Sequence, residues 1–314
     1  MLEDLVKAIR NRRAILFAGA GVSMTVGLPS WRTLIDHIAE ELRLDPEMVE
    51  GPDVNYLTLA EYYRLRQGSI GPLRSWMDRN WSIPEEVLRE SRVHELIARL
   101  DFPIIYTTNF DRNLETALQL HGKEFVKIVS AKDIARIREG VMQLVKFHGD
   151  FDDDQSIVIA ETDYLDRLSF ESPLDIKFHG DFEDDKSLVL AETDYFDRLA
   201  FASPLDVKFR ADALGKTILF VGYSLSDMNI RLLLYRLWQT WRDSGYEQNR
   251  PPSYVFMMRP NPIETSVLEQ WGIKVIVDET GSPEHALETF LGRLADAVGV
   301  DEDRPKRRTS GKRR

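Results

Sequence analysis

Hydrophobic and polar positions follow two alternating patterns along the chain. Short apolar runs of the kind found in buried strands occupy residues 13–18, 103–110, 141–149, 216–224, 253–259 and 273–278. Between them lie longer stretches with helical spacing, such as the one that carries Leu34, Ile35, Ile38 and Leu42. This alternation predicts an α/β fold with a doubly wound, parallel, Rossmann-like sheet of about six strands.

Helical patterning continues without a strand from residue 33 to residue 100. It includes "LTLAEYYRLRQ", "PLRSWMDRNW" and "PEEVLRESRVHELIARL", the last with proline near a helix start. We therefore expect an inserted helical lobe over 33–100 within a single domain spanning residues 1–300. Residues 301–314 are expected to form a disordered basic tail.

A duplicated segment interrupts the regular pattern. Residues 146–176 and 177–207 are tandem 31-residue copies that agree at 23 of 31 positions. Two copies do not make a solenoid, which needs three or more stacked units. We expect the fold to use the front of the first copy and the back of the second, with about 30 residues between them as a surface excursion.

Composition limits the class of protein. The chain has no cysteine, which excludes disulfides, thiolate catalysis and cysteine-ligated zinc. The net charge is −11, and without the seven basic residues of 304–314 it is −18 (34 basic minus 52 acidic), so direct nucleic-acid binding is expected only through the tail. No apolar run approaches membrane-spanning length, and the first residues lack the apolar core of a signal peptide, so a cytoplasmic protein is expected.

Four motifs follow strands of the predicted sheet. They are "FAGAGVSMTVGLPSWR" (17–32), "TTNFD" (107–111), "FHGD" (147–150) and "GYSLSD" (222–227). In doubly wound sheets, ligands gather at the carboxyl ends of strands, and glycines at a strand-to-helix turn let backbone N–H groups approach a pyrophosphate. Met24 occupies the place of the third glycine of the Rossmann fingerprint, so the glycine motif alone is also compatible with a turn that binds no ligand.

The ordered motifs resemble those of sirtuins, and specifically of the zinc-free, sirtuin-like NAD-hydrolysing domains of bacterial antiphage defence proteins. The sirtuin pattern G-A-G-x-S appears as residues 19–23, and G-[IL]-P-x-[FW]-R appears as residues 27–32. The resemblance covers roughly residues 10–280. It implies that NAD is the substrate and that no zinc is required.

The resemblance also implies a role for each matching residue. Residues implied to contact the pyrophosphate, the nicotinamide side and the adenosine ribose are Gly19, Ala20, Gly21, Ser23, Arg32, Gly222 and Ser224. Asn109 and Asp111 would hold the nicotinamide ribose and the attacking water, and His148 would act on the ribose hydroxyls as general base. Thr108 stands where the family usually has glutamine, and we count it with the binding residues.

These residue types suit cleavage of an N-glycosidic bond. Nicotinamide leaves as a neutral molecule, so the enzyme must stabilise an oxocarbenium-like ribose, position a nucleophile and accept one proton. Each residue also has a structural interpretation: Asn109 and Asp111 could cap the following helix, and a histidine at a strand end is often only a hydrogen-bonded polar group. The acidic run at 150–154 is interpreted as a solvated loop rather than a metal site, because its spacing fits no EF-hand.

Two histidines compete for the general-base position. His148 follows the β-rich "GVMQLVKF", whereas His179 follows "ESPLDIKF", which contains Pro173 and whose counterpart in the second copy opens a helix, with Arg210 at the place of the histidine. We therefore choose His148, while the similarity of the copies leaves a swap in favour of His179 open.

The sequence favours an NAD glycohydrolase that acts as a regulated effector of antiphage defence. Alternatives are a sirtuin-type protein deacylase or ADP-ribosyltransferase, disfavoured by the missing zinc cysteines, and a non-catalytic module that binds NAD or ADP-ribose. The resemblance implies a homo-oligomer and partnership with a translocase-type ATPase or an Argonaute-type protein.

Overall fold

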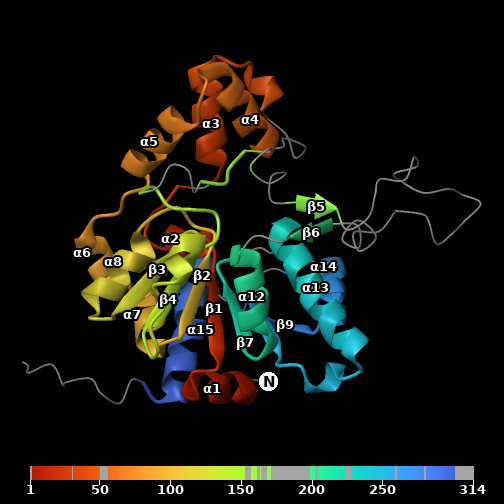
Figure 1. The fold of residues 1–314 in the computed structure, drawn as a ribbon. Coiled ribbons are helices and arrows are strands. Elements are labelled where there is room, and N and C mark those ends of the chain that lie inside the picture. The colour runs from red at the N-terminus through yellow and green to blue at the C-terminus, as the bar shows by residue number, and fades with distance from the viewer. Residues whose placement is uncertain are drawn as a thin grey trace, which may run out of the picture.

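A parallel sheet of seven strands runs through the centre of the protein in the computed structural model (Figure 1). Its order is β3 (Phe125–Ile128), β4 (Met142–Lys146), β2 (Ile104–Thr107), β1 (Ala14–Ala18), β7 (Thr217–Val221), β8 (Ser253–Met257) and β9 (Ile273–Val277). Every neighbouring pair is parallel. The α/β prediction is confirmed, and six of the strands match the six apolar runs.

The structure describes residues 2–29, 31–49, 56–152, 157–160, 163, 168–170, 199–201, 204–223, 228–258, 260–278 and 281–300. The basic tail and most of the second copy, including His179, lie outside these residues.

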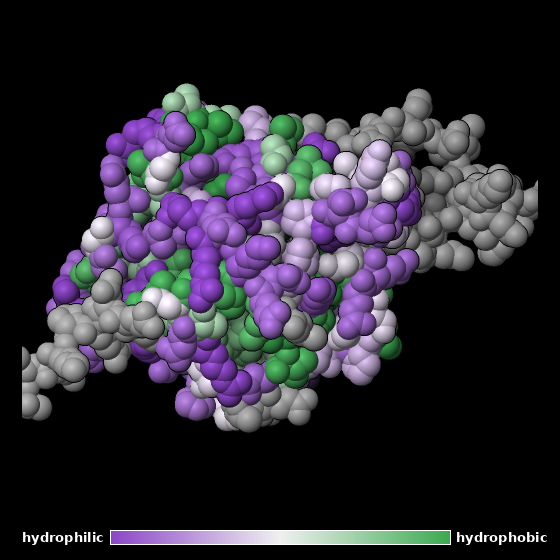
Figure 2. Space-filling view, turned by 90° about the horizontal axis from the view of Figure 1, so that it is seen from below, coloured by the Kyte–Doolittle hydropathy of each residue, from purple (hydrophilic) through white to green (hydrophobic). Residues whose placement is uncertain are grey.

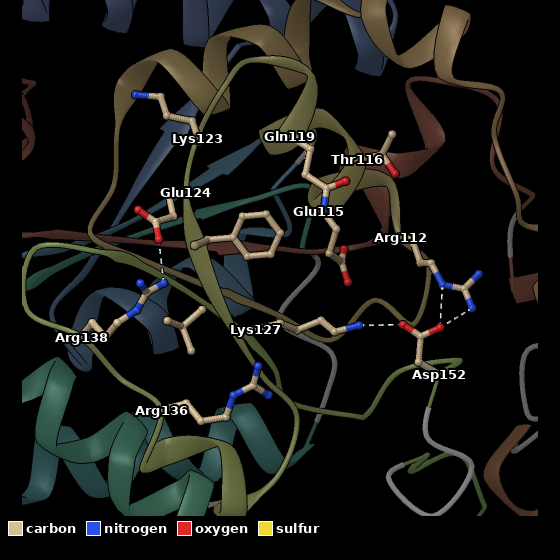
Figure 3. Close-up of a pocket in the computed structure, with 12 residues that line it drawn as sticks. Arg112, Glu115, Thr116, Gln119, Lys123, Glu124, Lys127, Arg136, Arg138 and Asp152 are labelled. Atoms are coloured by element: carbon tan, nitrogen blue, oxygen red, sulfur yellow. Dashed lines mark hydrogen bonds and ion pairs between the residues drawn. The ribbon is translucent and has the colours of Figure 1, made fainter.

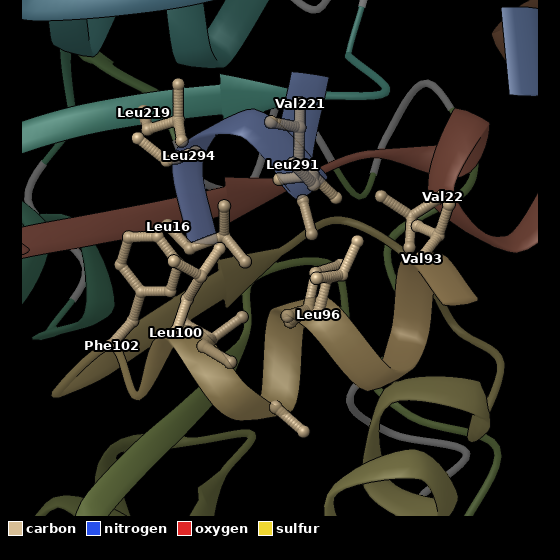
Figure 4. Packing of buried hydrophobic residues seen from close by; sticks show 14 of the residues in the cluster. Leu16, Val22, Val93, Leu96, Leu100, Phe102, Leu219, Val221, Leu291 and Leu294 are labelled. Carbon is tan, nitrogen blue, oxygen red and sulfur yellow. The ribbon is translucent and has the colours of Figure 1, made fainter. Parts of the chain in front are cut away.

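One face of the sheet is covered by α1 (Glu3–Arg10), α7 (Arg92–Leu100), α8 (Asn113–Leu120) and α15 (Pro283–Val298). Figure 4 shows how Leu96 and Leu100 of α7 and Leu291 of α15 pack against Leu16 of β1. The opposite face is covered by α12 (Pro204–Leu214), α13 (Met228–Ser244) and α14 (Pro262–Gln270). Because successive strand residues point to opposite faces, Leu16 and Phe17 belong to different cores.

A separate helical cluster lies above the carboxyl ends of the strands in Figure 1. It contains α3 (Trp31–Leu42), α4 (Tyr56–Gln67) and α5 (Gly71–Asn80), with the single 3-10 turn Pro46–Met48 after α3. Its core includes Leu34, Ile38, Tyr63 and Met77. These helices form the lobe-like part of the segment 33–100.

The end of the expected lobe belongs elsewhere. Residues 84–100, interpreted as one helix, form α6 (Glu85–Glu90) and α7, separated at Ser91, whose backbone is extended and whose hydroxyl accepts a hydrogen bond from the backbone N–H of His94. Residues of α7 pack in the sheet core rather than in the lobe. Ser91 acts as an N-cap, which is why the helix restarts there.

The strand missed from the sequence is β3, at the edge of the sheet. It has four residues, of which only Val126 and Ile128 are buried, so its apolar run is too short to distinguish from a loop. After β3 comes the single helical turn α9 (Ala131–Ile134).

Strand order places a switch point beside β1. The chain proceeds from β1 to β2 on one side and later returns to β7 on the other. At such a point the carboxyl ends of two strands separate and leave a crevice for a ligand. The first and fourth motifs, which follow β1 and β7, therefore meet there.

The two copies contact each other through equivalent residues. Strand β5 (Leu168–Phe170) pairs antiparallel with β6 (Leu199–Phe201), and Ser169 is level with Ala200, its counterpart 31 positions later. The helix expected at the end of the second copy is present as α12.

The opposite end of the molecule, seen from below in Figure 2, is where α1 lies and the strands begin. That face is mostly hydrophilic with separate hydrophobic groups. Among the described residues, no helix is long and apolar enough to cross a membrane. A helix of one to two turns, α2 (Ala20–Met24), follows β1, and a short 3-10 helix (Glu247–Asn249) follows α13.

Candidate functional site

The loops after β1 and β7 meet backbone to backbone. The Gly19 N–H donates to the Val221 carbonyl at 2.9 Å, and the Gly21 N–H donates to the Gly222 carbonyl at 2.8 Å. A Cβ atom on Gly19 would lie 2.3 Å from the Gly222 oxygen, and one on Gly222, which has φ +59°, would lie 2.5 Å from the Val22 nitrogen. The glycines are therefore needed first for the contact between the two loops.

An apolar pocket of about 390 Å³ adjoins these loops. Ala20, Gly21 and Gly222 form one wall, and the rest is lined by Met24, Tyr223, Phe256, Met257, Met258, Pro283 and Leu287. Such a pocket suits a flat, largely apolar ring system, with the backbone of the glycine loops at its edge.

Asn109 is held against the glycine loop. Its side-chain Nδ2 donates to the Gly19 carbonyl at 3.1 Å and to Ser23 Oγ at 3.3 Å, while its backbone N–H donates to Thr107 Oγ1 at 3.0 Å. The residue is buried. Its amide is thus fixed at the carboxyl ends of β1 and β2.

Asp111 reaches the same serine. Its carboxylate is hydrogen-bonded to Ser23, and Oδ1 accepts the backbone N–H of Asn113 at 3.0 Å. Burial raises the pKa of Asp111, although the nearby Lys146 ammonium opposes the shift. A buried carboxyl of this kind is typical of functional sites as well as of caps, and here the cap contact to Asn113 is present too.

His148 comes from the adjacent strand. Thr107 of β2 is paired with Lys146 of β4, so Asn109 and His148 both stand two residues beyond the same pair. His148 is buried, and its ring lies 6.5 Å from that of Phe110. Its carbonyl accepts the Val158 N–H at 2.9 Å. The strand that delivers His148 is therefore present, as expected.

Phe110 stands between Asn109 and Asp111 in the sequence but packs with residues of the helical cluster. It belongs to the core of the helical cluster and lies 6.0 Å from Phe151, which in turn lies 6.3 Å from Trp81. The motifs that follow β2 and β4 are thus anchored to the cluster by their aromatic residues.

Lys146 lies beside the candidate site and was not singled out from the sequence. It is fully buried, and its Nζ donates to the carbonyls of Phe110 at 2.9 Å and Asp111 at 2.7 Å, and to Glu115 Oε1 at 3.0 Å. It also pairs with Asp150 at 2.8 Å. The sequence did carry a signal for Lys146, because a lysine inside an apolar strand is expected to be buried and a buried lysine is rarely unpaired.

Asp150 extends this ionic network. Burial raises its pKa, but Lys146 and Lys127 outweigh that effect and hold it below the ordinary value. Lys127 pairs with Asp150 at 3.1 Å and with Asp152 at 2.7 Å. Asp150, at the end of the third motif, therefore belongs to a cluster of ion pairs that begins two residues after His148.

The remaining predicted residues differ in their placement. Arg32 is half-exposed on α3, where it pairs with Asp36 at 2.8 Å and donates to the Val49 carbonyl at 3.1 Å, so the structure assigns it to the helical cluster rather than to the Asn109 group. Thr108 is half-buried beside Asn109. Ser224 lies outside the described residues.

Metal binding has no support among these side chains. Within the part of the chain that the structure describes, no group of three or more His, Asp or Glu side chains is placed to hold a metal ion.

Comparison with known proteins agrees with the motif order. A model of the SIR2-like domain family matches residues 103–176 and 171–276, together more than half of the chain. The chain is 29% identical over 295 residues to the NAD(+) hydrolase ThsA of Bacillus cereus, covering 88% of this chain and 53% of that protein. It is 25% identical over 285 residues to defence-associated sirtuin 2 of Bacillus subtilis, covering 88% of this chain and 24% of that protein.

The chain therefore spans about half the length of the Bacillus cereus protein and about a quarter of the length of the Bacillus subtilis protein. Among solved structures, a Sir2 homologue in complex with NAD aligns over 94% of both chains with 14% identity and a TM-score of 0.43. On the family match, this chain belongs to the SIR2-like family.

Proposed function

We propose that this chain hydrolyses NAD to nicotinamide and ADP-ribose. The observation that carries the proposal is the convergence of Asn109 and Asp111 on Ser23, beside the glycine loops and the apolar pocket. Relatives that match most of this chain are named NAD(+) hydrolases, which supports the same activity.

The pocket beside Ala20, Gly21 and Gly222 would take the adenine half of NAD, with the pyrophosphate along the glycine loop. The nicotinamide ribose would then lie toward Asn109 and His148. This arrangement places the reacting carbon where β1, β2 and β4 end.

In the proposed reaction, the bond between C1′ of the ribose and the nicotinamide nitrogen breaks, and its electron pair leaves with neutral nicotinamide. The oxygen of a water molecule bonds to C1′, and the proton it loses passes to His148 and then to solvent. Asn109 would orient the ribose and the water, and Asp111 would stabilise positive charge on the ring.

Two other functions would use the same fold. A protein deacylase or ADP-ribosyltransferase needs an acceptor site, for which the sequence shows no acyl-lysine-binding loop. A module that only binds NAD or ADP-ribose would keep the pocket but release no nicotinamide.

The cellular role belongs to the proposal as well. We propose a regulated effector of bacterial antiphage defence, cytoplasmic and homo-oligomeric, and held inactive until a trigger arrives. One of the relatives is itself named a defence-associated sirtuin. A translocase-type ATPase or an Argonaute-type protein is the proposed partner class.

The test is nicotinamide release from NAD by the purified protein, with and without Asn109→Ala. Loss of the amide that positions the ribose should lower turnover by about 100-fold or more while the protein still melts cooperatively. Asn80→Ala is the matched control, because Asn80 is exposed on α5 and only caps its own helix. Near-normal turnover by the Asn109 variant would overturn the assignment, and acylated peptides added to the same assay would detect deacylation.

A further inference from the structure

A second pocket lies at the edge of the sheet, beside β3. It has a volume of about 770 Å³ and is enclosed by α8, β3, the segment after α9 and Asp152. Figure 3 shows the side chains of Arg112, Lys127, Arg136 and Arg138 arranged around Glu115. None of its residues lines the pocket beside Ala20 and Gly222.

The residues that line this edge pocket carry a net positive charge, although the protein as a whole is acidic. Five of its lining residues are Lys or Arg and three are Asp or Glu, whereas the chain outside its last 11 residues has a charge of −18. Two of the arginines are themselves exposed: Arg138 pairs with the exposed Glu124 at 2.7 Å, and Arg136 pairs at 3.2 Å with Asp133, whose carboxylate is buried. An exposed pair such as Arg138–Glu124 contributes at most about 1 kcal/mol, so an incoming anion can replace it at little cost.

Glu115 gives the pocket an acceptor. It is 7% exposed, and while Oε1 binds Lys146, Oε2 is buried without a hydrogen-bond partner among the described residues. Burial raises the pKa of Glu115 to about 7. Because Glu115 lines the pocket, a ligand donor would complete this contact once the side chain turns Oε2 toward it.

We propose that the edge pocket is a second ligand site, which binds a nucleotide or a phosphate ester of similar size, separately from NAD. The phosphates would lie on Arg112, Lys127 and Arg136, and a hydroxyl or amino group would donate to Glu115 Oε2. Phe125 and Val126 supply an apolar wall for a base. The volume is within the range of sites for small organic ligands and well above that needed for a single inorganic ion.

The edge pocket is connected to the catalytic motifs through ion pairs. Lys146 joins Glu115 to the carbonyls of Phe110 and Asp111. Asp152, four residues after His148, is bound at 2.7 Å by both Arg112 and Lys127. A phosphate on these two cations would displace Asp152 and loosen the segment that carries His148, so the ligand should inhibit NAD cleavage.

The direct test is calorimetric titration of the whole chain with ATP, and with tripolyphosphate as the phosphate-only probe. The double variant Arg136→Ala, Arg138→Ala should bind ATP at least about 10-fold more weakly, since it loses the phosphate contact of Arg136 and the positive charge of Arg138 at the pocket wall. Arg293→Ala is the matched control, because its side chain is as exposed as that of Arg136, 69% in both cases. No binding of ATP, or equal binding by the double variant and the control, overturns the proposal, as does binding of an oligonucleotide alone.

The pH dependence gives an independent readout. The charged groups that act on Glu115 are Lys146 and Asp150 of the β4 segment and Lys127 of β3, while Glu95, Arg99 and Arg89 of α6 and α7 act on His121 instead. Above pH 7 the ionised carboxylate repels a phosphate, and below pH 7 it does not. At pH 8, Glu115→Gln should therefore bind ATP about 5- to 10-fold more tightly than the unaltered protein, and at pH 6 about equally. If the ratio of the two ATP affinities were the same at pH 6 and pH 8, Glu115 would not be part of the binding site.

The expected inhibition by ATP rests on the proposed hydrolysis of NAD, whereas the expected binding of ATP to the edge pocket does not. ATP should lower the maximal rate of nicotinamide release, and the Arg136, Arg138 double variant should lose this effect while keeping its basal rate. ATP inhibition that only raises the apparent KM for NAD and persists in the double variant would place ATP in the NAD site and overturn the proposal. Absence of nicotinamide release without ATP would instead contradict the proposed function.

Discussion

Ser23 connects the two polar residues that follow β2 to the loop that follows β1. Its hydroxyl is hydrogen-bonded to both Asn109 and Asp111, and it is fully buried. A single serine therefore fixes two side chains of the proposed site, and we expect its loss to affect both.

Single substitutions can distinguish between the two candidate histidines. His148→Ala should lower nicotinamide release by roughly 100-fold to 10,000-fold if a fixed general base is lost. His179→Ala should cost almost nothing, as should His285→Ala, which alters an exposed histidine of α15. Each variant is assayed after a thermal melt confirms cooperative unfolding.

A loss confined to His179→Ala would show that the second copy supplies the histidine. Equal partial losses in the His148 and His179 variants would indicate two interchangeable registers.

The glycine contact is testable through a matched pair of substitutions. Gly222→Ala should destabilise the protein by more than about 2 kcal/mol, because the new methyl group meets the Val22 nitrogen and the backbone is left-handed. Gly292→Ala, in open space inside α15, should stabilise it by about 0.5–1 kcal/mol. Urea unfolding of the two variants measures both. A tolerated Gly222→Ala would mean that the two loops do not interlock.

Among the elements, the two copies of the repeat behave differently. In the first copy, Phe147 packs against the sheet and residues 157–160 pack in the helical cluster, whereas α12 at the end of the second copy covers the sheet. The β5–β6 pair brings Leu168 level with Phe201, so the two ends of the intervening segment are neighbours.

Removal of one repeat unit should therefore be tolerated. Deleting residues 170–200 joins Ser169 to Phe201, which lie next to each other across the pair, and keeps the front of the first copy and the back of the second. We expect a melting temperature within a few degrees of the full chain and nicotinamide release within about threefold, since loop length has little effect on stability. An insoluble or inactive deletion variant would show that the extra unit is part of the fold.

At the scale of the whole molecule, the absence of cysteine makes zinc independence a firm expectation. A chelator such as EDTA should change neither the thermal melt nor nicotinamide release, because there are no thiolates to hold a structural zinc. Unfolding or inactivation by the chelator, reversed by added zinc, would contradict this.

The charge of the whole molecule also bears on the edge pocket. A body with a charge of −18 repels polyanions at long range, so a basic pocket at its surface selects small anions rather than nucleic acid. This is why the proposed ligand is a nucleotide.

The fold class and the candidate residues of the proposed site could be predicted from the sequence. Six apolar runs were long enough to be recognised as buried strands. The resemblance of four ordered motifs to those of sirtuins then gave Gly19, Ser23, Asn109, Asp111 and His148 as candidates. Strand β3 was not recognised in the sequence, because an edge strand of four residues buries only alternate side chains.

Only the tertiary structure decided which residues meet. Lys146, Glu115 and Asp150 are scattered over 36 positions of the sequence and acquire their roles when α8 and β4 come together. The contact of Gly222 with Gly21 likewise depends on β7 crossing back to lie beside β1. Such long-range proximity follows from strand order, which single-sequence periodicity does not encode, whereas each strand's own burial is encoded by its apolar residues.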